Sequence, residues 1–175
     1  MIVLAIQDNR QEMALLRDAL SNFTKVPILV EHADRLSVAL SYLAVRRFDA
    51  ILLDLNLPDS AGLDTLARVQ AQAPELPVVI LTDLNAEPLA ILAVQNGAQD
   101  YVLKGPYNGG ATYRSLRTAV ERKRLMTDLN ERIAGQESRR VSLFEEYQAR
   151  LLELMQSKAI ISGELHLAAQ AITET

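Results

Sequence analysis

Four side chains with reactive or charge-binding groups each follow a short apolar run of this sequence. They are Asp8, Asp54, Thr82 and Lys104, which come after apolar runs at 2–6, 50–53, 78–81 and 101–103. Two carboxylates held close together repel each other and need a cation between them. Because Asp8 and Asp54 offer hard oxygen ligands without histidine or cysteine nearby, Mg²⁺ is the cation that they favour. Opposite that ion, a hydroxyl and an ammonium group could bind a phosphoryl group, which Asp54 could accept as an acyl phosphate.

These side chains can act together only if the strands end at one edge of a sheet. Segments with helical spacing, such as Met13, Leu16 and Leu20, lie between the apolar runs, which include a further run at 27–30. Strands that alternate with amphipathic helices predict a parallel sheet, and right-handed crossovers favour helices on both of its faces. We therefore predict an α/β fold, a flavodoxin-like doubly wound five-stranded parallel sheet in the order 2-1-3-4-5. In that order, strands 1, 3, 4 and 5 are neighbours, so one crevice would hold all four side chains.

The first loop argues against two nucleotide-binding alternatives. It reads Gln7-Asp8-Asn9-Arg10-Gln11 and contains no glycine, so it cannot hold a pyrophosphate as a Rossmann half-domain does. A flavin-binding electron carrier would need a loop rich in Ser, Thr and Gly there, and this loop is not.

Composition and charge indicate the setting. The chain has 175 residues, 49% of them hydrophobic, and no cysteine, which excludes disulfides and thiolate metal sites. Residues 1–111 carry 8 basic and 13 acidic side chains, and residues 112–175 carry 10 and 9. We expect no direct binding to nucleic acid, because the first part is acidic. No apolar stretch suits a membrane span, and the start of the chain resembles a strand rather than a signal peptide, so we expect no membrane association and a cytoplasmic location.

Residues 1–111 resemble the receiver domain of a two-component response regulator. Three segments carry the resemblance beyond Asp8. They are the loop Asp54-x-x-x-Pro58-x-x-x-Gly62, the strand Pro77–Thr82, and the segment Asn96–Lys104 with the sequence Asn-Gly-Ala-Gln-Asp-Tyr-Val-Leu-Lys. Several motifs at strand ends, in order and suitably spaced, are more specific than any one of them.

The resemblance implies a role for each candidate site residue. Asp54 would be phosphorylated, and Mg²⁺ would be bound by Asp8, Asp54 and the backbone carbonyl of Asn56. Thr82 and Lys104 would bind the phosphoryl group. Tyr101 would be an aromatic switch that reports phosphorylation to the face formed by the fourth helix, fifth strand and fifth helix. The phosphoryl donor would be a sensor histidine kinase or a phosphotransfer protein, and the chain would signal rather than act as an enzyme.

Three residues depart from the family pattern. Gln7 stands where the family usually has an acidic residue, Asp83 follows Thr82 where a small residue is usual, and Gly105 separates Lys104 from Pro106. These departures leave an alternative, a degenerate receiver that is not phosphorylated and serves as a docking and dimerisation module. The Gly105 departure also predicts an altered loop after the fifth strand.

Helical composition continues beyond the receiver segment. We expect a receiver domain at 1–120 and a helical extension at 121–175, with Val141, Phe144, Gln148, Leu151 and Met155 spaced three or four residues apart. This spacing is typical of a coiled coil, so we expect a signalling helix that pairs in a parallel homodimer. Gly135 and the polar segment 136–140 leave open whether the helix is continuous. The segment 161–175 resembles the first helix of a GAF domain, which suggests that the chain is part of a larger protein.

Overall fold

A five-stranded parallel sheet forms the centre of the receiver part of the chain. The computed structural model describes residues 1–23, 27–105 and 109–173, with side chains described as far as residue 156. The strands of the main sheet are β1 (Ile2–Ile6), β2 (Leu29–Ala33), β3 (Ala50–Asp54), β6 (Val78–Thr82) and β7 (Asp100–Leu103). Their order is β2-β1-β3-β6-β7, which confirms the predicted order 2-1-3-4-5.

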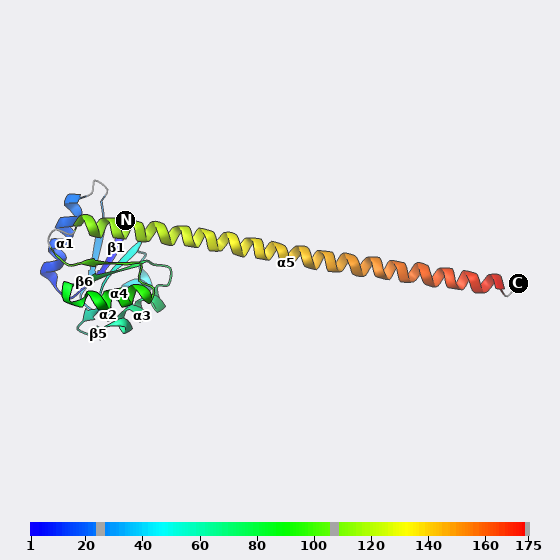
Figure 1. Cartoon of the computed structure of the whole chain (residues 1–175), viewed down its shortest axis with the longest axis horizontal. Helices are drawn as coiled ribbons and strands as arrows, with labels where there is room; N and C mark the ends of the chain where they lie inside the picture. The colour runs from blue at the N-terminus through cyan, green and yellow to red at the C-terminus, as the bar shows by residue number, and fades with distance from the viewer. Residues whose placement is uncertain (24–26, 106–108, 174–175) are drawn as a thin grey trace. The chain divides into compact units, whose positions relative to one another are not determined.

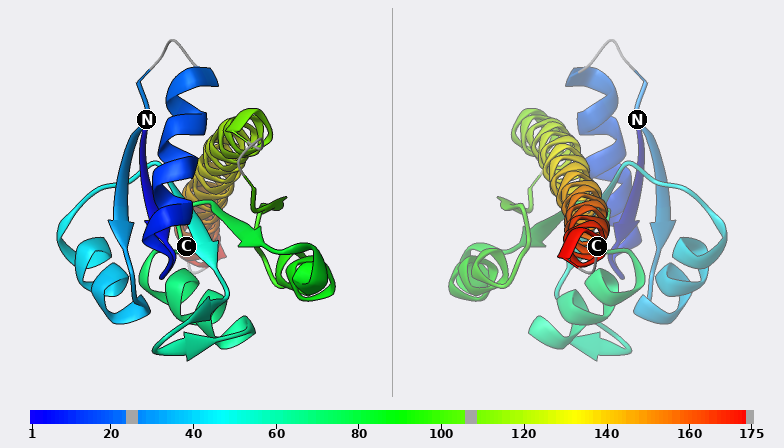
Figure 2. Two further views of the ribbon diagram at one scale, coloured as in Figure 1. Left: turned by 90° about the vertical axis from the view of Figure 1, so that its left-hand side faces the viewer. Right: turned by 90° about the vertical axis from the view of Figure 1, so that its right-hand side faces the viewer.

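Helices cover both faces of this sheet (Figure 2). They are α1 (Arg10–Phe23), α2 (Leu36–Val45), α3 (Leu63–Gln72), the 3₁₀ turn η1 (Leu84–Ala86), α4 (Glu87–Gln95) and α5 (Gly109–Thr173). One face packs against α2, α3 and α4 through a core that includes Leu36, Leu66 and Ala90. The other packs against α1 and the start of α5 through Met13 and Leu116. Side chains alternate between these two cores along each buried strand, as expected for a parallel sheet covered on both sides.

The second strand lies later in the chain than the apolar pattern predicted. The prediction placed it at 27–30, but the paired segment is Leu29–Ala33, because it runs in register with β1 from Ile2 to Ile6. Glu31 and His32 are tolerated there because β2 is an edge strand, on which both side chains are only partly buried. The boundaries of the other four strands agree with the prediction to within one residue.

A short antiparallel pair lies in the segment after β3 that the sequence presented as a loop. It consists of β4 (Asn56–Leu57) and β5 (Ser60–Ala61), joined by Pro58 and Asp59. Gly62 then takes a positive φ of 66° immediately before α3, a conformation that favours glycine.

The helix α5 is continuous through Gly135, so the polar segment does not interrupt it. The chain divides into two compact units, Met1–Met126 and Thr127–Thr175. Figure 1 labels the helices and strands and colours the chain by residue number. Within the first unit, the start of α5 approaches α1 closely, because a Cβ atom added at Gly109 would lie 2.4 Å from the carbonyl oxygen of Ala19. In the described residues, no helix has the length and apolar character needed to cross a membrane.

Candidate functional site

Asp54 is the last residue of β3, and its side chain is buried at the carboxyl end of the sheet. Only 5% of the residue is exposed. Its Oδ1 atom accepts a hydrogen bond of 2.9 Å from the backbone N–H of Asn56, a local turn contact that aspartate commonly makes two residues ahead. The backbone after Asp54 therefore orients the carboxylate, while Oδ2 faces the ammonium group of Lys104.

Lys104 supplies the positive charge at this carboxylate. It follows β7, and its Nζ atom lies 2.6 Å from Oδ2 of Asp54. The sheet order places β6 between β3 and β7, so the lysine side chain reaches across the end of one strand. The contact is largely shielded from solvent, because the side chains of Lys104 and Asp54 are 15% and 7% exposed.

Two further carboxylates surround the ammonium group of Lys104. Glu12 Oε2 and Asp83 Oδ2 lie 3.5 Å and 3.6 Å from its Nζ atom. Burial alone would lower the pKa of Lys104, but the hydrogen bond and charge of Asp54, with smaller contributions from Glu12 and Asp83, raise it above its ordinary value. The neighbouring carboxylates therefore stabilise the protonated form of Lys104 more than burial opposes it.

Gln7, in the position where the family usually has an acid, holds one of these carboxylates. It is buried, and its side-chain amide donates a hydrogen bond to Oε2 of Glu12. Asn9 donates a second hydrogen bond of 3.0 Å to Oε1 of Glu12. The backbone of Gln7 is also fixed, since its N–H donates to the carbonyl of Ala33 and its carbonyl lies 2.6 Å from Nε2 of His32.

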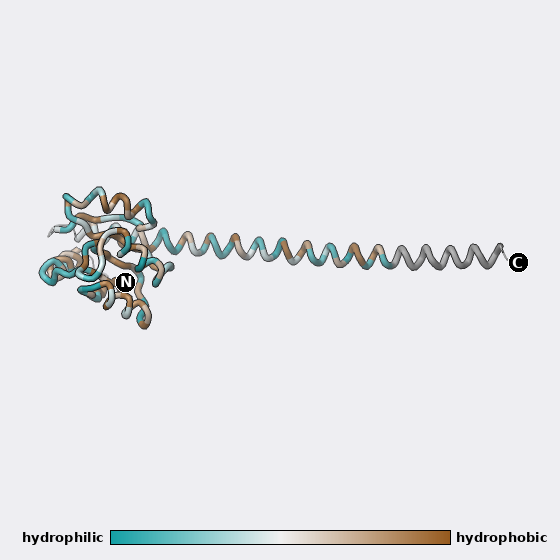
Figure 3. The backbone as a smooth tube through the Cα atoms, turned by 90° about the horizontal axis from the view of Figure 1, so that it is seen from below, coloured by the Kyte–Doolittle hydropathy of each residue, from teal (hydrophilic) through white to brown (hydrophobic). Residues whose placement is uncertain are grey.

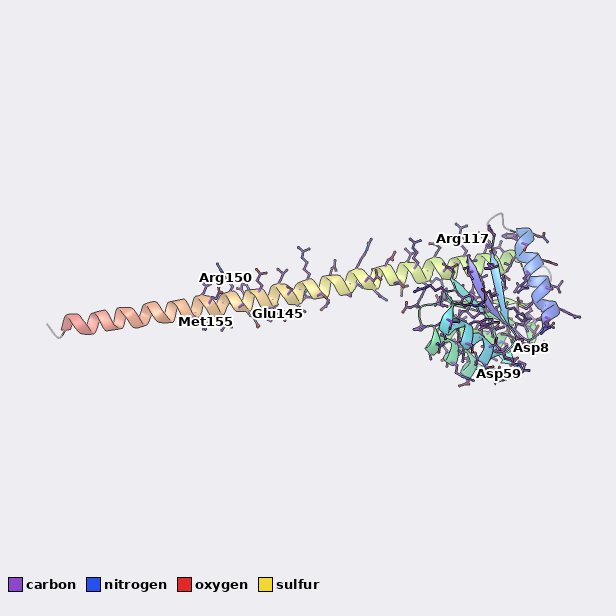
Figure 4. The ribbon with its side chains drawn as sticks, turned by 180° about the vertical axis from the view of Figure 1, so that it is seen from behind. Asp8, Asp59, Arg117, Glu145, Arg150 and Met155 are labelled. Atoms are coloured by element: carbon purple, nitrogen blue, oxygen red, sulfur yellow. The ribbon has the colours of Figure 1, made fainter. Side chains whose placement is uncertain are left out.

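The other residues predicted for the phosphoryl and metal site, Thr82, Asp8 and Asn56, lie at the same end of the sheet and differ in burial. Thr82 is buried at the end of β6, and its hydroxyl donates to the carbonyl of Asp83 over 3.2 Å. Asp8 and Asn56 are exposed at the same end of the sheet, and Figure 4 labels Asp8 there. Among the side chains that the structure describes, no three acidic or histidine residues form a ready-made metal cluster.

Tyr101 lies on a separate surface. Its hydroxyl donates a hydrogen bond of 2.6 Å to Oε1 of Glu87, at the start of α4. This hydrogen bond, followed by burial and by the charges of Glu87 and Asp100, raises the pKa of Tyr101 above 10.0. Tyr101 also lines a cavity of about 550 Å³ that includes residues of α4, β7 and α5. The structure thus places Tyr101 on the predicted signalling face, hydrogen-bonded to Glu87.

The loop after Lys104 was predicted to be altered by Gly105. The structure gives Gly105 a φ of 151°, and residues 106–108 of this loop lie outside the described residues. Gly105 and Lys104 border a second cavity, of about 260 Å³, which Glu12 and Asp83 also line.

Three residues that contribute to this region were not predicted from the sequence, namely Glu12, Glu87 and Asp59. Glu12 had a local signal, because Asn9 precedes it by three residues in the pattern of a helix-capping pair, and the Asn9 side chain accepts from the backbone N–H of Gln11 and Glu12. The partners of Glu87 and Asp59 are distant in sequence, so no local pattern marks them.

Comparison with known proteins is consistent with this geometry. The model of the response regulator receiver domain family matches residues 3–109. The regulatory protein LuxO of Vibrio cholerae is 39% identical over 66 residues, which cover 38% of this chain and 14% of LuxO. The transcriptional regulatory protein BaeR of Escherichia coli is 31% identical over 132 residues, which cover 75% of this chain and 53% of BaeR. The crystal structure of NtrX from Brucella abortus superposes with a TM-score of 0.65 at 25% identity, covering 74% of this chain and 29% of NtrX.

The chain matches a limited part of these relatives, about half of BaeR and less of LuxO and NtrX. The family model covers the part of this chain that contains the sheet, Asp54 and Lys104. The chain therefore belongs to the response regulator receiver domain family.

Proposed function

We propose that Asp54 accepts a phosphoryl group and that this chain is the receiver of a two-component phosphorelay. The observation that carries the proposal is the 2.6 Å contact between Lys104 Nζ and Asp54 Oδ2 at the buried carboxyl end of β3. The Asp54 carboxylate can act as a nucleophile toward phosphorus. The ammonium group of Lys104, now paired with it, can then bind the oxygens of the incoming phosphoryl group.

The reaction is a transfer from a donor histidine or a small acyl phosphate. A carboxylate oxygen of Asp54 forms a bond to phosphorus while the bond from phosphorus to the donor nitrogen or oxygen breaks, and the leaving group departs with that electron pair. Lys104 then pairs with the transferred group, and the Thr82 hydroxyl exchanges its contact with the Asp83 carbonyl for a phosphoryl oxygen. Both groups already lie at this end of the sheet, so little rearrangement is required.

The donor set at this end of the sheet fits Mg²⁺. Asp8, Asp54 and the Asn56 carbonyl would hold it, which agrees with the preference of Mg²⁺ for one or two carboxylates and several waters. The ion would neutralise charge on the phosphoryl group. Gln7 adds no carboxylate, and its amide donates to Glu12, so this site has fewer acidic ligands than the family pattern provides.

The proposed partners and setting follow from family membership. A sensor histidine kinase or phosphotransfer protein would supply the phosphoryl group to a cytoplasmic receiver. Phosphorylation would change the populations of the α4–β7–α5 surface that contains Tyr101, and α5 would convey that change to a dimer partner or output domain.

Acetyl phosphate labelling tests the assignment of Asp54. The protein is incubated with acetyl phosphate and Mg²⁺, and its intact mass is measured. We expect the mass of one added phosphoryl group in the native chain and in Asp59→Asn, a control in the same loop, and none in Asp54→Ala. An unmodified native chain, under conditions that label another receiver, would contradict the proposal. Labelling of Asp54→Ala would show that a residue other than Asp54 is phosphorylated.

The degenerate docking module is the second candidate function. The observation that favours it is that Lys104 has three carboxylates within 4 Å. Because these carboxylates already pair with the ammonium group, they would compete with a phosphoryl group for it. This alternative predicts no labelling together with a dimer in light scattering.

The extension of α5 supports the proposal of a parallel homodimer. Hydrophobic positions recur along this helix (Figure 3). Among the exposed apolar side chains are Leu129, Ile133, Val141, Phe144, Leu151 and Met155. In a parallel pair seated on the part of the stripe from Val141 to Met155, heptad spacing places Arg140 of one copy beside Glu145 of the other. A second copy of the chain therefore matches the stripe in both apolar character and charge.

Disulfide cross-linking tests the dimer cleanly, because the native chain has no cysteine. Ile133→Cys and Phe144→Cys place a thiol on the stripe, and Glu131→Cys and Glu146→Cys place one on the opposite side of the same helix turns. We expect oxidation to cross-link the first pair and not the second. Equal cross-linking of all four variants, or cross-linking only in a mixture of Ile133→Cys with Phe144→Cys, would contradict a parallel dimer.

A further inference from the structure

Glu12 brings a carboxylate from α1 to the lysine of the proposed phosphoryl site. Its Oε2 atom lies 3.5 Å from Lys104 Nζ, although the two residues are far apart in sequence. Asp54 binds the same ammonium group at 2.6 Å. Lys104 is thus shared between a buried carboxylate on β3 and a half-exposed carboxylate on α1.

The position of Glu12 is fixed by its neighbours. Gln7 donates to one carboxylate oxygen of Glu12 and Asn9 donates to the other, so both oxygens have a hydrogen-bond donor besides Lys104. Gln7 is 1% exposed and is itself fixed by backbone hydrogen bonds to β2. A side chain held in this way keeps its charge directed at Lys104, whereas a free surface glutamate would move through solvent.

We propose that Glu12 is a positioning residue for Lys104. It shares the charge of the ammonium group with Asp54 and thereby limits how fully Lys104 neutralises charge added at Asp54. Gln7 and Glu12 act as one unit in this arrangement, because the Gln7 amide holds the carboxylate of the residue five positions along the chain. The consequence for phosphorylation rests on the proposed function, but the hold on Lys104 does not.

The substitution Glu12→Gln removes the charge and preserves the shape. The new amide oxygen can still accept from Gln7, and the side chain of Glu12 is 38% exposed, so the variant is expected to fold, which urea unfolding verifies. Asp83→Asn is the matched control, because Asp83 lies 3.6 Å from Lys104 but its side chain is 67% exposed. Solvent screening should make its effect smaller than that of Glu12→Gln.

The first measurement uses the unphosphorylated protein. The chain has four lysines, at 25, 104, 123 and 158, and their acylation by a limiting amine reagent can be compared by peptide mass spectrometry. Lys123 serves as the reference, since its Nζ donates to the carbonyl of Pro74. We expect Glu12→Gln to accelerate acylation of Lys104 relative to Lys123 by about 3-fold, a change of the size expected for losing one partly exposed ion pair. Gln7→Leu, which removes the anchor and keeps the charge, should give a smaller increase.

The second measurement uses beryllofluoride, an anion that occupies the position of a phosphoryl group, with Mg²⁺ present. Glu12→Gln should lower the half-saturating concentration by about 3-fold, because Lys104 becomes free to pair with the anion. An unchanged Lys104 acylation ratio in Glu12→Gln would overturn the proposal. If the native chain binds no beryllofluoride, the phosphoacceptor function fails while the acylation result still decides the role of Glu12.

Discussion

Lys104 and Asp54 form an ion pair of 2.6 Å that spans the end of β6 and connects two strands that are not neighbours in the sheet. The pair lies where both side chains are shielded from solvent. We expect the pair to contribute to the stability of the fold, and mutation can measure that contribution apart from the proposed phosphorylation.

The stability of the receiver part should depend on this pair. Lys104→Met leaves Asp54 as an uncompensated buried charge, so we expect a loss of about 3 kcal/mol in the free energy of unfolding. Asp54→Asn removes that charge, and the double variant Asp54→Asn/Lys104→Met should recover part of the loss. Urea unfolding of the four proteins gives the coupling energy, and a coupling of zero would show that the contact contributes nothing to stability.

Asp59 links the loop after β3 to α2. Its Oδ1 and Oδ2 atoms accept from the backbone N–H groups of Leu36 and Ser37 at 2.8 Å and 2.9 Å, so it caps a helix from a distant part of the chain. Asp59→Ala should lower the free energy of unfolding by about 1 kcal/mol. Asp59→Asn, which retains a capping oxygen, should cost less.

The contribution of Asp59 should also depend on pH. The hydrogen bond from Ser37 is the largest of the causes that lower the pKa of Asp59 from 3.8 to about 2. A lowered pKa means that the capping contribution is complete above pH 3.8 and is lost as the pH falls toward 2. Urea unfolding at pH 6 and at pH 3 should thus show a smaller difference between the native chain and Asp59→Ala at the lower pH. A difference that grows on acidification would have the wrong sign.

The contact between Tyr101 and Glu87 should be visible in the titration of the tyrosine. The hydrogen bond to Glu87 raises the pKa of Tyr101, so its stabilising contribution is present below pH 10 and is lost as the hydroxyl ionises. Glu87→Gln should lower this pKa toward 10.0, as measured by NMR of the Tyr101 ring carbon. If the titration of Tyr101 is the same in both proteins, the hydroxyl does not bind Glu87 in solution.

Two glycines of α5 should respond to alanine in opposite directions. A Cβ at Gly109 would lie 2.4 Å from the backbone carbonyl oxygen of Ala19, so Gly109→Ala should destabilise the receiver part by about 2 kcal/mol through overpacking. A Cβ at Gly135 would meet nothing within 4 Å, so Gly135→Ala should stabilise its helix locally by up to about 1 kcal/mol. Urea unfolding measures the first effect and amide hydrogen exchange around residue 135 the second. Destabilisation by both substitutions would contradict the close approach of α1 and α5 as the cause.

Some predictions about the helical extension, residues 121–175, are not tested by the structure. The assignment of residues 121–175 to a separate signalling extension remains a prediction, as does the resemblance of 161–175 to a GAF helix, whose side chains lie beyond those described. Helix continuity was decided by the structure, because one glycine costs only about 1 kcal/mol and the flanking helix propensity outweighs it.

Local sequence patterns were enough to predict the class of fold and the four residues at the strand ends. Apolar runs that alternate with amphipathic segments specify a parallel sheet, and such a sheet brings its chemistry to the carboxyl ends of its strands. The register of β2 did not follow from the same pattern, because strand pairing with β1, rather than local hydrophobicity, sets where an edge strand begins and ends.

The groups that share the charge of Lys104 could be identified only from the folded chain. Glu12 and Asp54 meet at one ammonium group because α1 packs beside the strand ends, and no spacing along the chain encodes that meeting. From the sequence, Gln7 was the loss of a carboxylate that the family usually has. In the fold, its side-chain amide donates a hydrogen bond to the carboxylate of Glu12, which lies on α1. Local pattern specifies elements, whereas the balance of charges at a site depends on contacts between elements that are distant in sequence.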